Sequence, residues 1–265
     1  MKKVKIHNTN LNVSKFVFGT ASLFNAGSSQ TRFELIEEAV DNGFTHFDTA
    51  PYYGFGQAER DLGAVLQQHP NITVTTKVGI YSPGGEEQTP FSTFLRKAGG
   101  KVLTSLSKPS IDFSVLRAKA SIEGSLRRLK RDKIDVFMLH EPSIELLETE
   151  EWLQWLESLK EEGKVGNYGI AVDEKQALTF LKVKSPLLEV IQIKDGLIDK
   201  NADVLTEFNR PFQFTYGYVS EALSKDLGKP VPEVLKNALD RNTTGAVLVS
   251  TTNKSRIKQY ADLVG

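Results

Sequence analysis

Short apolar runs alternate along this chain with longer segments in which apolar residues recur every three or four positions. The short runs are β-branched or aromatic and predict strands, whereas the longer segments predict helices. One helix is expected over Val115–Leu129, with Ser114 as its amino-terminal cap. Another is expected over Thr31–Asp41, where Thr31 and Glu34 fit a capping box.

Eight predicted strands are each followed by a predicted helix. We expect the strands at Phe16–Phe18, Thr45–Asp48, Thr73–Lys77, Val136–Leu139, Val165–Ile170, Val190–Lys194, Phe212–Phe214 and Ala246–Ser250. This alternation predicts an α/β protein with a single (β/α)8 TIM barrel over residues 1–265. A doubly wound open sheet is the competing topology, but the turn after the first strand, GTASLFNAG, has no G-x-G-x-x-G motif.

Two segments depart from the repeat. Lys3–His7 and Leu11–Lys15 flank Asn8–Asn10 and predict an N-terminal β-hairpin that plugs the amino-terminal mouth of the barrel. After the third strand comes a long loop, Ile80–Ser114, which is rich in glycine and proline. Because such long loops are often lids or binding loops, we expect this one to be mobile and to wall a pocket. Its apolar side chains are those of Tyr81, Phe91, Phe94, Leu95 and Leu103.

The composition excludes several classes of protein. With 33 basic and 33 acidic residues the formal charge is zero, so nothing indicates binding to nucleic acid or to an anionic membrane. Cysteine is absent, which excludes disulfides, thiolate catalysis and cysteine-ligated metal. The start of the chain lacks the apolar segment of a signal peptide, and no apolar run has membrane-spanning length. We expect a soluble, cytoplasmic protein and favour a monomer.

Four ionisable residues stand where a predicted strand gives way to a loop. Asp48 ends THFD, Lys77 ends ITVTTK and His140 ends IDVFMLH. Tyr53 follows closely after Asp48, in DTAPYYG. Because the carboxyl ends of barrel strands converge on one face, we expect these four side chains to meet there.

The four side chains suit the reduction of a carbonyl group. A phenol has an unperturbed pKa of about 10, and a nearby ammonium favours the phenolate and lowers that pKa. We therefore expect Tyr53 to donate a proton, with Lys77 and Asp48 as its tuning pair. His140 would orient the carbonyl by hydrogen bonding. None of the four can supply a hydride, so a nicotinamide cofactor is required.

The segments FDTAPYYG, TTKVG, SLRRLKRDKIDVFMLHEP and EEGKVGNYGIAV closely resemble those of the aldo-keto reductase superfamily. The resemblance runs in register from Phe18 to about Gln259. It implies an NAD(P)-dependent barrel oxidoreductase that interconverts an aldehyde or ketone and an alcohol, with a small molecule as its partner. It also implies the same roles for the four site residues as their chemistry suggests.

The resemblance further implies how the cofactor is bound. Gln192 in VIQIK matches the family glutamine near the nicotinamide carboxamide, and Tyr216 in FTYGY matches an aromatic residue that stacks on the nicotinamide ring. VSTTNKSRIKQY resembles the segment that binds the adenosine phosphate, with Arg256 at the position that pairs with the 2′-phosphate. NADP is therefore expected, with NAD as the alternative. The expected cofactor contacts are Gly19, Thr20, Asp48, Gln192, Tyr216, Ser250, Thr251, Thr252, Arg256 and Gln259.

Some positions depart from the family pattern. Ala171 and Val172 replace a serine and an asparagine that bind the carboxamide in many relatives. Ser250 stands where a lysine often assists the 2′-phosphate, which weakens the preference for NADP, and Tyr260 replaces the usual asparagine near the adenine. Many relatives continue beyond the position of Gly265 with a long loop that shapes the substrate pocket. We expect the loop after the third strand to take over that task.

Two other functions remain open. A barrel of this family that binds nucleotide could serve as a regulatory or scaffold subunit, although a pure binder has no need for Tyr53. A metal-dependent hydrolase could use His46, Asp48 and His140 as ligands. The chain has only four histidines, and His46 is more simply read as a packed barrel residue, so we expect no metal site.

Overall fold

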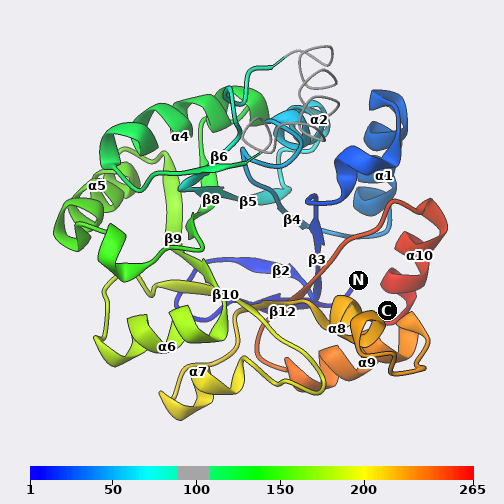
Figure 1. Ribbon diagram of the computed structural model, residues 1–265. Helices are drawn as coiled ribbons and strands as arrows, with labels where there is room; N and C mark the ends of the chain where they lie inside the picture. Colours follow the sequence, from blue (N-terminus) through cyan, green and yellow to red (C-terminus); the bar gives the residue numbers. More distant parts are fainter. Residues whose placement is uncertain (89–107) are drawn as a thin grey trace.

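Eight parallel strands close into a barrel, and helices surround this barrel as an outer ring (Figure 1). The computed structural model describes residues 1–88 and 108–265. The barrel strands are β3 (Phe16–Gly19), β4 (His46–Asp48), β5 (Thr73–Val78), β8 (Ile134–His140), β9 (Val165–Val172), β10 (Val190–Lys194), β11 (Phe214–Tyr216) and β12 (Ala246–Val249). Their order is β10-β11-β12-β3-β4-β5-β8-β9, and β9 pairs with β10 to close the ring. The predicted (β/α)8 barrel is confirmed.

The helices follow the strands in the predicted alternation. Two short 3-10 helices, η1 (Leu23–Ala26) and η3 (Ile144–Leu146), precede α1 and α5. The α-helices are α1 (Ser29–Asp41), α2 (Gln57–Leu66), α4 (Val115–Leu129), α5 (Thr149–Glu161), α6 (Glu174–Lys182), α7 (Asp203–Glu207), α8 (Tyr218–Ser224), α9 (Val231–Arg241) and α10 (Lys254–Asp262).

The caps of two helices show where the sequence pattern was right and where it was wrong. Helix α4 begins after Ser114, whose side chain accepts a hydrogen bond from the backbone N–H of Arg117, as predicted. The capping box expected at Thr31 and Glu34 was wrong. Ser28 caps α1 instead, because its hydroxyl accepts from the backbone N–H of Thr31, and the helix therefore begins earlier than predicted.

Strand β11 lies two residues further along the chain than predicted. Its parallel pairing with β10 places Gln192 opposite Phe214 and Lys194 opposite Tyr216. Phe212, which was expected in the strand, packs under the guanidinium of Arg241 instead, 5.4 Å from ring centroid to Cζ. The shift brings Tyr216 to the carboxyl end of its strand.

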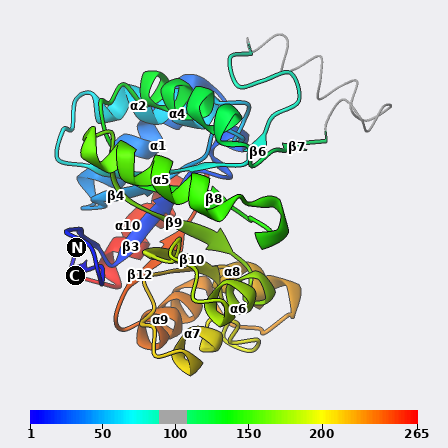
Figure 2. The same ribbon diagram turned by 90° about the vertical axis from the view of Figure 1, so that its left-hand side faces the viewer.

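A small hairpin covers one mouth of the barrel, as predicted. Strands β1 (Lys3–Lys5) and β2 (Asn12–Ser14) pair antiparallel. Ile6 and Leu11, in the turn between them, are buried against residues at the starts of barrel strands, among them Val190 and Phe214. The two chain termini lie side by side at this end (Figures 1 and 2), where the Lys2 N–H donates to the Val264 carbonyl at 2.9 Å. The hairpin therefore closes the barrel interior to ligands at the amino-terminal ends of the strands.

The described ends of the long loop stand on the side of the barrel away from the termini (Figure 2). There β6 (Ile80–Tyr81) pairs antiparallel with β7 (Ser110–Ile111). The two described ends of the loop expected after the third barrel strand thus lie side by side. Among the described helices, none has both the length and the apolar character needed to cross a membrane.

Candidate active site

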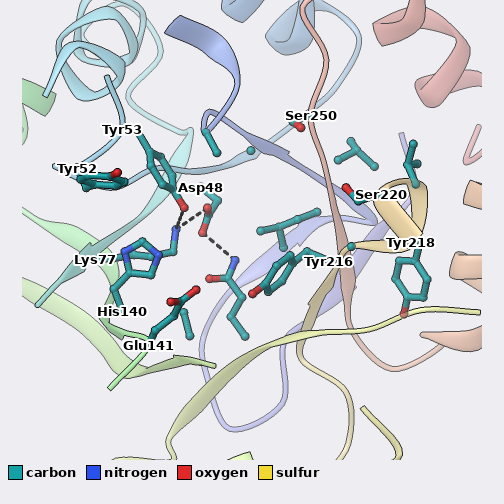
Figure 3. Close-up of a pocket in the computed structure, with 18 of the residues that line it drawn as sticks. Asp48, Tyr52, Tyr53, Lys77, His140, Glu141, Tyr216, Tyr218, Ser220 and Ser250 are labelled. Atoms are coloured by element: carbon teal, nitrogen blue, oxygen red, sulfur yellow. Dashed lines mark hydrogen bonds and ion pairs between the residues drawn. The ribbon is translucent and has the colours of Figure 1, made fainter. Parts of the chain in front are cut away.

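A cavity of about 560 Å³ opens at the carboxyl ends of the barrel strands (Figure 3). It contains the four residues whose meeting the sequence predicted, and several of the expected cofactor contacts. The expected site residues that line it are Gly19, Asp48, Tyr53, Lys77, His140, Gln192, Tyr216 and Ser250. The other expected contacts, which do not line it, are Thr20, Thr251, Thr252, Arg256 and Gln259.

A buried ion pair forms the floor of the cavity. The ammonium of Lys77 donates to Asp48 Oδ1 at 2.6 Å and to the Thr49 carbonyl at 2.9 Å. Only 2% of Lys77 and 4% of Asp48 is exposed. Burial alone would lower the pKa of Lys77, but Asp48 and then Tyr53 oppose it, and the pKa is raised. Lys77 is therefore charged at neutral pH.

Tyr53 lies above this pair, at the start of an unusual turn. The ammonium of Lys77 is 3.4 Å from the Tyr53 hydroxyl oxygen. Gly54, Phe55 and Gly56 follow with φ angles of 61°, 59° and 77°, a left-handed run that glycine adopts at little cost. At Gly54 a Cβ atom would also lie 2.7 Å from the ring of Phe24. The glycines allow the chain to turn sharply and present the phenol to Lys77.

The direction of the Tyr53 pKa differs from the expectation. Burial raises the pKa of Tyr53 most, and although Lys77 lowers it, the net direction is upward. The loss of hydration on burial outweighs the effect of the ammonium. A raised pKa keeps the phenol protonated at neutral pH, as a proton donor requires. Lys77 is placed to stabilise the phenolate once the proton has left.

His140 faces Tyr53 across the cavity. The two rings meet edge to face, with centroids 5.9 Å apart and planes at 86°. Burial, together with the charge of Lys77, lowers the pKa of His140 to about 3. The imidazole is thus neutral at physiological pH. Its ring N–H can donate a hydrogen bond to a carbonyl oxygen without transferring the proton.

One buried acceptor in the lining of the cavity lacks a partner in the part of the chain that the structure describes. Gln192 donates through Nε2 to Asp48 Oδ2 at 2.9 Å. Its Oε1 is buried and forms no hydrogen bond within residues 1–88 and 108–265, which carries a cost unless a ligand supplies a donor. Ala171 and Tyr216 line the same region. A carboxamide N–H₂ group beside the Tyr216 ring would satisfy this oxygen, so these residues fit a nicotinamide.

The expected contacts outside the lining fall into two groups. Thr20 is buried, and its hydroxyl donates to the Asp48 carbonyl at 3.0 Å, so it supports the site from behind. Thr251 is also buried, and its hydroxyl accepts from the Asn253 N–H. The exposed residues of this group are Thr252, Arg256 and Gln259. They lie at the start and on the outer face of α10, beyond Ser250 and Tyr260, which line the cavity.

Several lining residues were not singled out from the sequence. Glu141 follows His140 directly, and Tyr52 precedes Tyr53. A signal for both was their adjacency to a predicted catalytic residue. Tyr218 also lines the cavity, with its hydroxyl donating to Asp195 Oδ2 at 2.6 Å. Nothing local marked Tyr218, because Asp195 lies on another segment of the chain.

The described ends of the long loop contribute to the lining of the cavity. Ile80 and Pro109 line the cavity, which agrees with the expected wall. Tyr81 was expected to wall the pocket, but it is only 1% exposed and packs in the core between barrel and helices, because strand alternation turns its side chain away from Ile80. The other apolar residues, Phe91, Phe94, Leu95 and Leu103, lie outside the described residues. The mobility expected of the Ile80–Ser114 loop stays a prediction.

His46 is a packed residue of the barrel interior. Its ring nitrogens lie 2.7 Å from Thr73 Oγ1 and 2.8 Å from Thr75 Oγ1, and the ring stacks on Phe214. With both nitrogens engaged, His46 has none to offer a metal. In the part of the chain that the structure describes, no three His, Asp or Glu side chains are grouped as metal ligands. The residues therefore do not favour the hydrolase alternative.

Comparison with known proteins agrees with this geometry. The model of the aldo/keto reductase family matches residues 15–186. A D-threo-aldose 1-dehydrogenase from a Pseudomonas species is 33% identical over 60% of this chain and 49% of its own length. An NADH-specific methylglyoxal reductase from Escherichia coli is 29% identical over 76% of this chain and 60% of its own length. The chain thus spans about half to three fifths of these relatives.

Solved structures show the same fold over the whole chain. A glycerol dehydrogenase from Gluconobacter oxydans superposes with a TM-score of 0.76 at 20% identity, and covers 100% of this chain and 90% of its own. An aldo-keto reductase from Bacillus halodurans, in its holo form, gives 0.77 at 22% identity, with 100% and 91% coverage. At this level of identity the likeness concerns the barrel alone.

Proposed function

The chain belongs to the aldo/keto reductase family, and we propose that it is an oxidoreductase in which Tyr53 exchanges the proton and a nicotinamide cofactor the hydride. The named relatives are dehydrogenases and reductases, which supports oxidoreductase activity in general. The observation that carries the finer proposal is the position of Lys77. Its buried ammonium lies 2.6 Å from Asp48 Oδ1 and 3.4 Å from the Tyr53 hydroxyl.

In this proposal the chain's own residues move one proton and hold the substrate carbonyl. When bound, the cofactor supplies the hydride that adds to the carbonyl carbon, or accepts it in the reverse direction. Tyr53 gives its phenolic proton to the oxygen as negative charge develops there. Lys77 stabilises the phenolate left behind. His140, neutral at physiological pH, donates a hydrogen bond that orients the same oxygen.

Asp48 and Gln192 would hold the other components in register. Asp48 keeps Lys77 charged and fixed, and its second oxygen accepts from Gln192 Nε2 at 2.9 Å. That bond leaves the Gln192 oxygen free for the nicotinamide carboxamide. Tyr216 would stack on the ring. Where many relatives have a serine and an asparagine for the carboxamide, Ala171 lines the cavity and is apolar, whereas Val172 is fully buried in the core between barrel and helices.

We further propose that NADP binds more tightly than NAD, and that NAD is also accepted. Arg256 stands on the exposed face of α10, where it could pair with a 2′-phosphate. The ammonium of Lys254, at the helix start, is 3.4 Å from Glu38 Oε2. This ion pair makes Lys254 less available to a 2′-phosphate. One relative is NADH-specific by name, so the preference is expected to be modest.

Steady-state oxidation of NADPH and NADH against a panel of small aldehydes and ketones tests the proposal. We expect turnover with at least one carbonyl, and its loss in Tyr53→Phe. A protein that binds either cofactor but reduces no carbonyl in the panel would fit a nucleotide-binding regulatory barrel instead. The relatives' named substrates, an aldose, methylglyoxal and glycerol, are sensible members of the panel.

A further inference from the structure

Glu141 presents an unpaired carboxylate to the cavity beside His140 (Figure 3). The residue is exposed. Within residues 1–88 and 108–265, its carboxylate has neither an ion-pair nor a hydrogen-bond partner, since its only bonds are made by the backbone. A free acceptor so close to the predicted catalytic groups is available to a substrate.

The backbone of Glu141 fixes where this carboxylate stands. Its φ angle is 52°, a left-handed conformation that is unfavourable for a residue with a Cβ atom. Two bonds hold it there: the N–H donates to the Ala171 carbonyl at 2.8 Å, and the carbonyl accepts from Gln176 Nε2 at 3.1 Å. Gln176 is itself held by the capping box of α6. The side chain therefore starts from a fixed position between β8 and β9.

Glu141 also determines the net charge of the side chains in the described lining of the cavity. Apart from its tyrosines, the ionisable residues in the described lining are Asp48, Lys77, His140 and Glu141. Asp48 and Lys77 neutralise each other, and burial keeps His140 neutral. One negative charge is left, and it belongs to Glu141. An anionic substrate would find no free cation among these residues.

The carboxylate stands near the reacting groups. Burial raises the pKa of Tyr216 most, and the negative charge of Glu141 adds to it. The same carboxylate also raises the pKa of Tyr53, after burial and Asp48. Glu141 is thus close to both the proposed proton donor and the ring expected to stack on the nicotinamide. A carbonyl oxygen at Tyr53 and His140 would bring the neighbouring carbons of a substrate toward Glu141.

We propose that Glu141 selects the substrate: it accepts hydrogen bonds from hydroxyl groups near the reacting carbonyl and disfavours carboxylate and phosphate groups. The substrate class is then a neutral hydroxylated aldehyde or ketone. This inference rests on the proposed oxidoreductase function. A hydrogen bond to a charged acceptor is strong enough to change kcat/KM by about tenfold, and a like charge acts in the opposite direction.

Four aldehydes separate the effects: propanal as the reference, glyceraldehyde for hydroxyls, succinic semialdehyde for an anion and betaine aldehyde for a cation. Each kcat/KM is divided by that for propanal, in wild type and in Glu141→Gln. We expect the glyceraldehyde ratio to fall by about tenfold in the variant and the succinic semialdehyde ratio to rise by about tenfold. Glu145→Gln, which removes an exposed carboxylate outside the cavity, should leave both ratios unchanged.

The outcomes distinguish this inference from the function on which it rests. If wild type reduces none of the four aldehydes, the oxidoreductase proposal itself is in doubt. If wild type reduces propanal and glyceraldehyde but Glu141→Gln keeps the wild-type ratios, the selection by Glu141 is refuted and the function stands. A wild-type preference for betaine aldehyde, lost in the variant without change in the glyceraldehyde ratio, would refute the assignment to hydroxyl groups. Equal shifts in Glu145→Gln would show a general effect of net charge and refute it too.

Discussion

The ammonium of Lys77 lies 3.4 Å from the hydroxyl oxygen of Tyr53, although the two residues come from different βα units. The same nitrogen lies 5.0 Å from the centroid of the Tyr53 ring. Lys77 is thus closer to the hydroxyl oxygen than to the centre of the ring, and is positioned to meet a negative charge on that oxygen. This contact joins the structural ion pair at the cavity floor to the proposed chemistry above it.

Replacement of Tyr53 by phenylalanine should abolish most carbonyl reduction and spare cofactor binding. Only the phenolic proton is removed, and one general acid contributes at least about a hundredfold in rate. The measurement is kcat with the best aldehyde, together with the Kd for NADPH. Tyr52→Phe is the matched control, since Tyr52 also lines the cavity but is not among the described residues that accept a hydrogen bond from Lys77. An equal loss in both variants would contradict the role of Tyr53.

The sequence located much of this site because strands end where their apolar runs end. Asp48, Lys77 and His140 each close such a run, and the barrel then brings them together without further information. Tyr53 was harder to place from local rules. Gly54 and Gly56 signal a turn, but the left-handed φ of Phe55 and the distance to Lys77 depend on the whole fold.

Other features could not be predicted, because they depend on burial and on register. The upward shift of the Tyr53 pKa results from the loss of hydration, which no local pattern reports. The place of β11 was missed because Phe212 is as apolar as a strand residue, and only pairing with β10 showed that the strand ends at Tyr216. Glu141 looks like an ordinary charged loop residue in the sequence. Only its position in the cavity gives it a role.

Loss of Lys77 should cost stability as well as activity. In Lys77→Met the Asp48 carboxylate, 4% exposed, loses the one cation that pairs with it among the described residues, and breaking a buried pair in this way costs about 3–5 kcal/mol. The double variant Asp48→Asn, Lys77→Met removes both charges and should recover much of that loss. Urea unfolding of the three proteins measures this. If the double variant is less stable than Lys77→Met, the unpaired charge is not the cause.

Acid should destabilise the protein through His46. This residue is fully buried, and burial, with a smaller effect of Lys77, lowers its pKa to about 3, against about 6.5 when unfolded. Between these values the unfolded state binds one more proton, so the free energy of unfolding falls as pH falls, by about 1.4 kcal/mol per pH unit.

Comparison of wild type with His46→Leu between pH 6.5 and pH 5 isolates this effect, because His140, whose pKa is also lowered to about 3, is present in both proteins. His46 should contribute about 2 kcal/mol to the loss of stability over that interval. His46→Leu will be less stable at both pH values, because Thr73 and Thr75 lose their partner. The readout is therefore its smaller dependence on pH. Urea unfolding that shows the same pH dependence in both proteins would contradict a neutral buried His46.

Removal of the Gln192 side-chain oxygen should weaken cofactor binding. Gln192→Met keeps the volume but provides no strong acceptor for a carboxamide N–H, and the lost hydrogen bond is worth about tenfold in Kd. Fluorescence titration with NADPH measures the change. Because the substitution also removes a donor to Asp48, a titration with ADP-ribose, which lacks the nicotinamide, serves as the control. Equal weakening of both ligands would assign Gln192 to the ion pair alone.

The choice between NADP and NAD should depend on Arg256. A guanidinium can grip a 2′-phosphate with two hydrogen bonds, but this one stands on an exposed helix face, where solvent weakens the pair. The nearby Lys254 is close to Glu38, and Ser250 offers no charge.

We therefore expect NADPH to bind roughly tenfold more tightly than NADH, and Arg256→Ala to remove that difference. Isothermal titration calorimetry with both cofactors measures it. The side chain of Arg256 also hydrogen-bonds to Tyr260, which is expected near the adenine; because both cofactors carry adenine, the ratio of their affinities cancels any effect of the substitution on that contact. Lys258→Ala removes another exposed cation of α10 and should keep the wild-type ratio. Equal wild-type affinities, or an Arg256→Ala variant that retains the full preference, would rule out pairing of Arg256 with the 2′-phosphate.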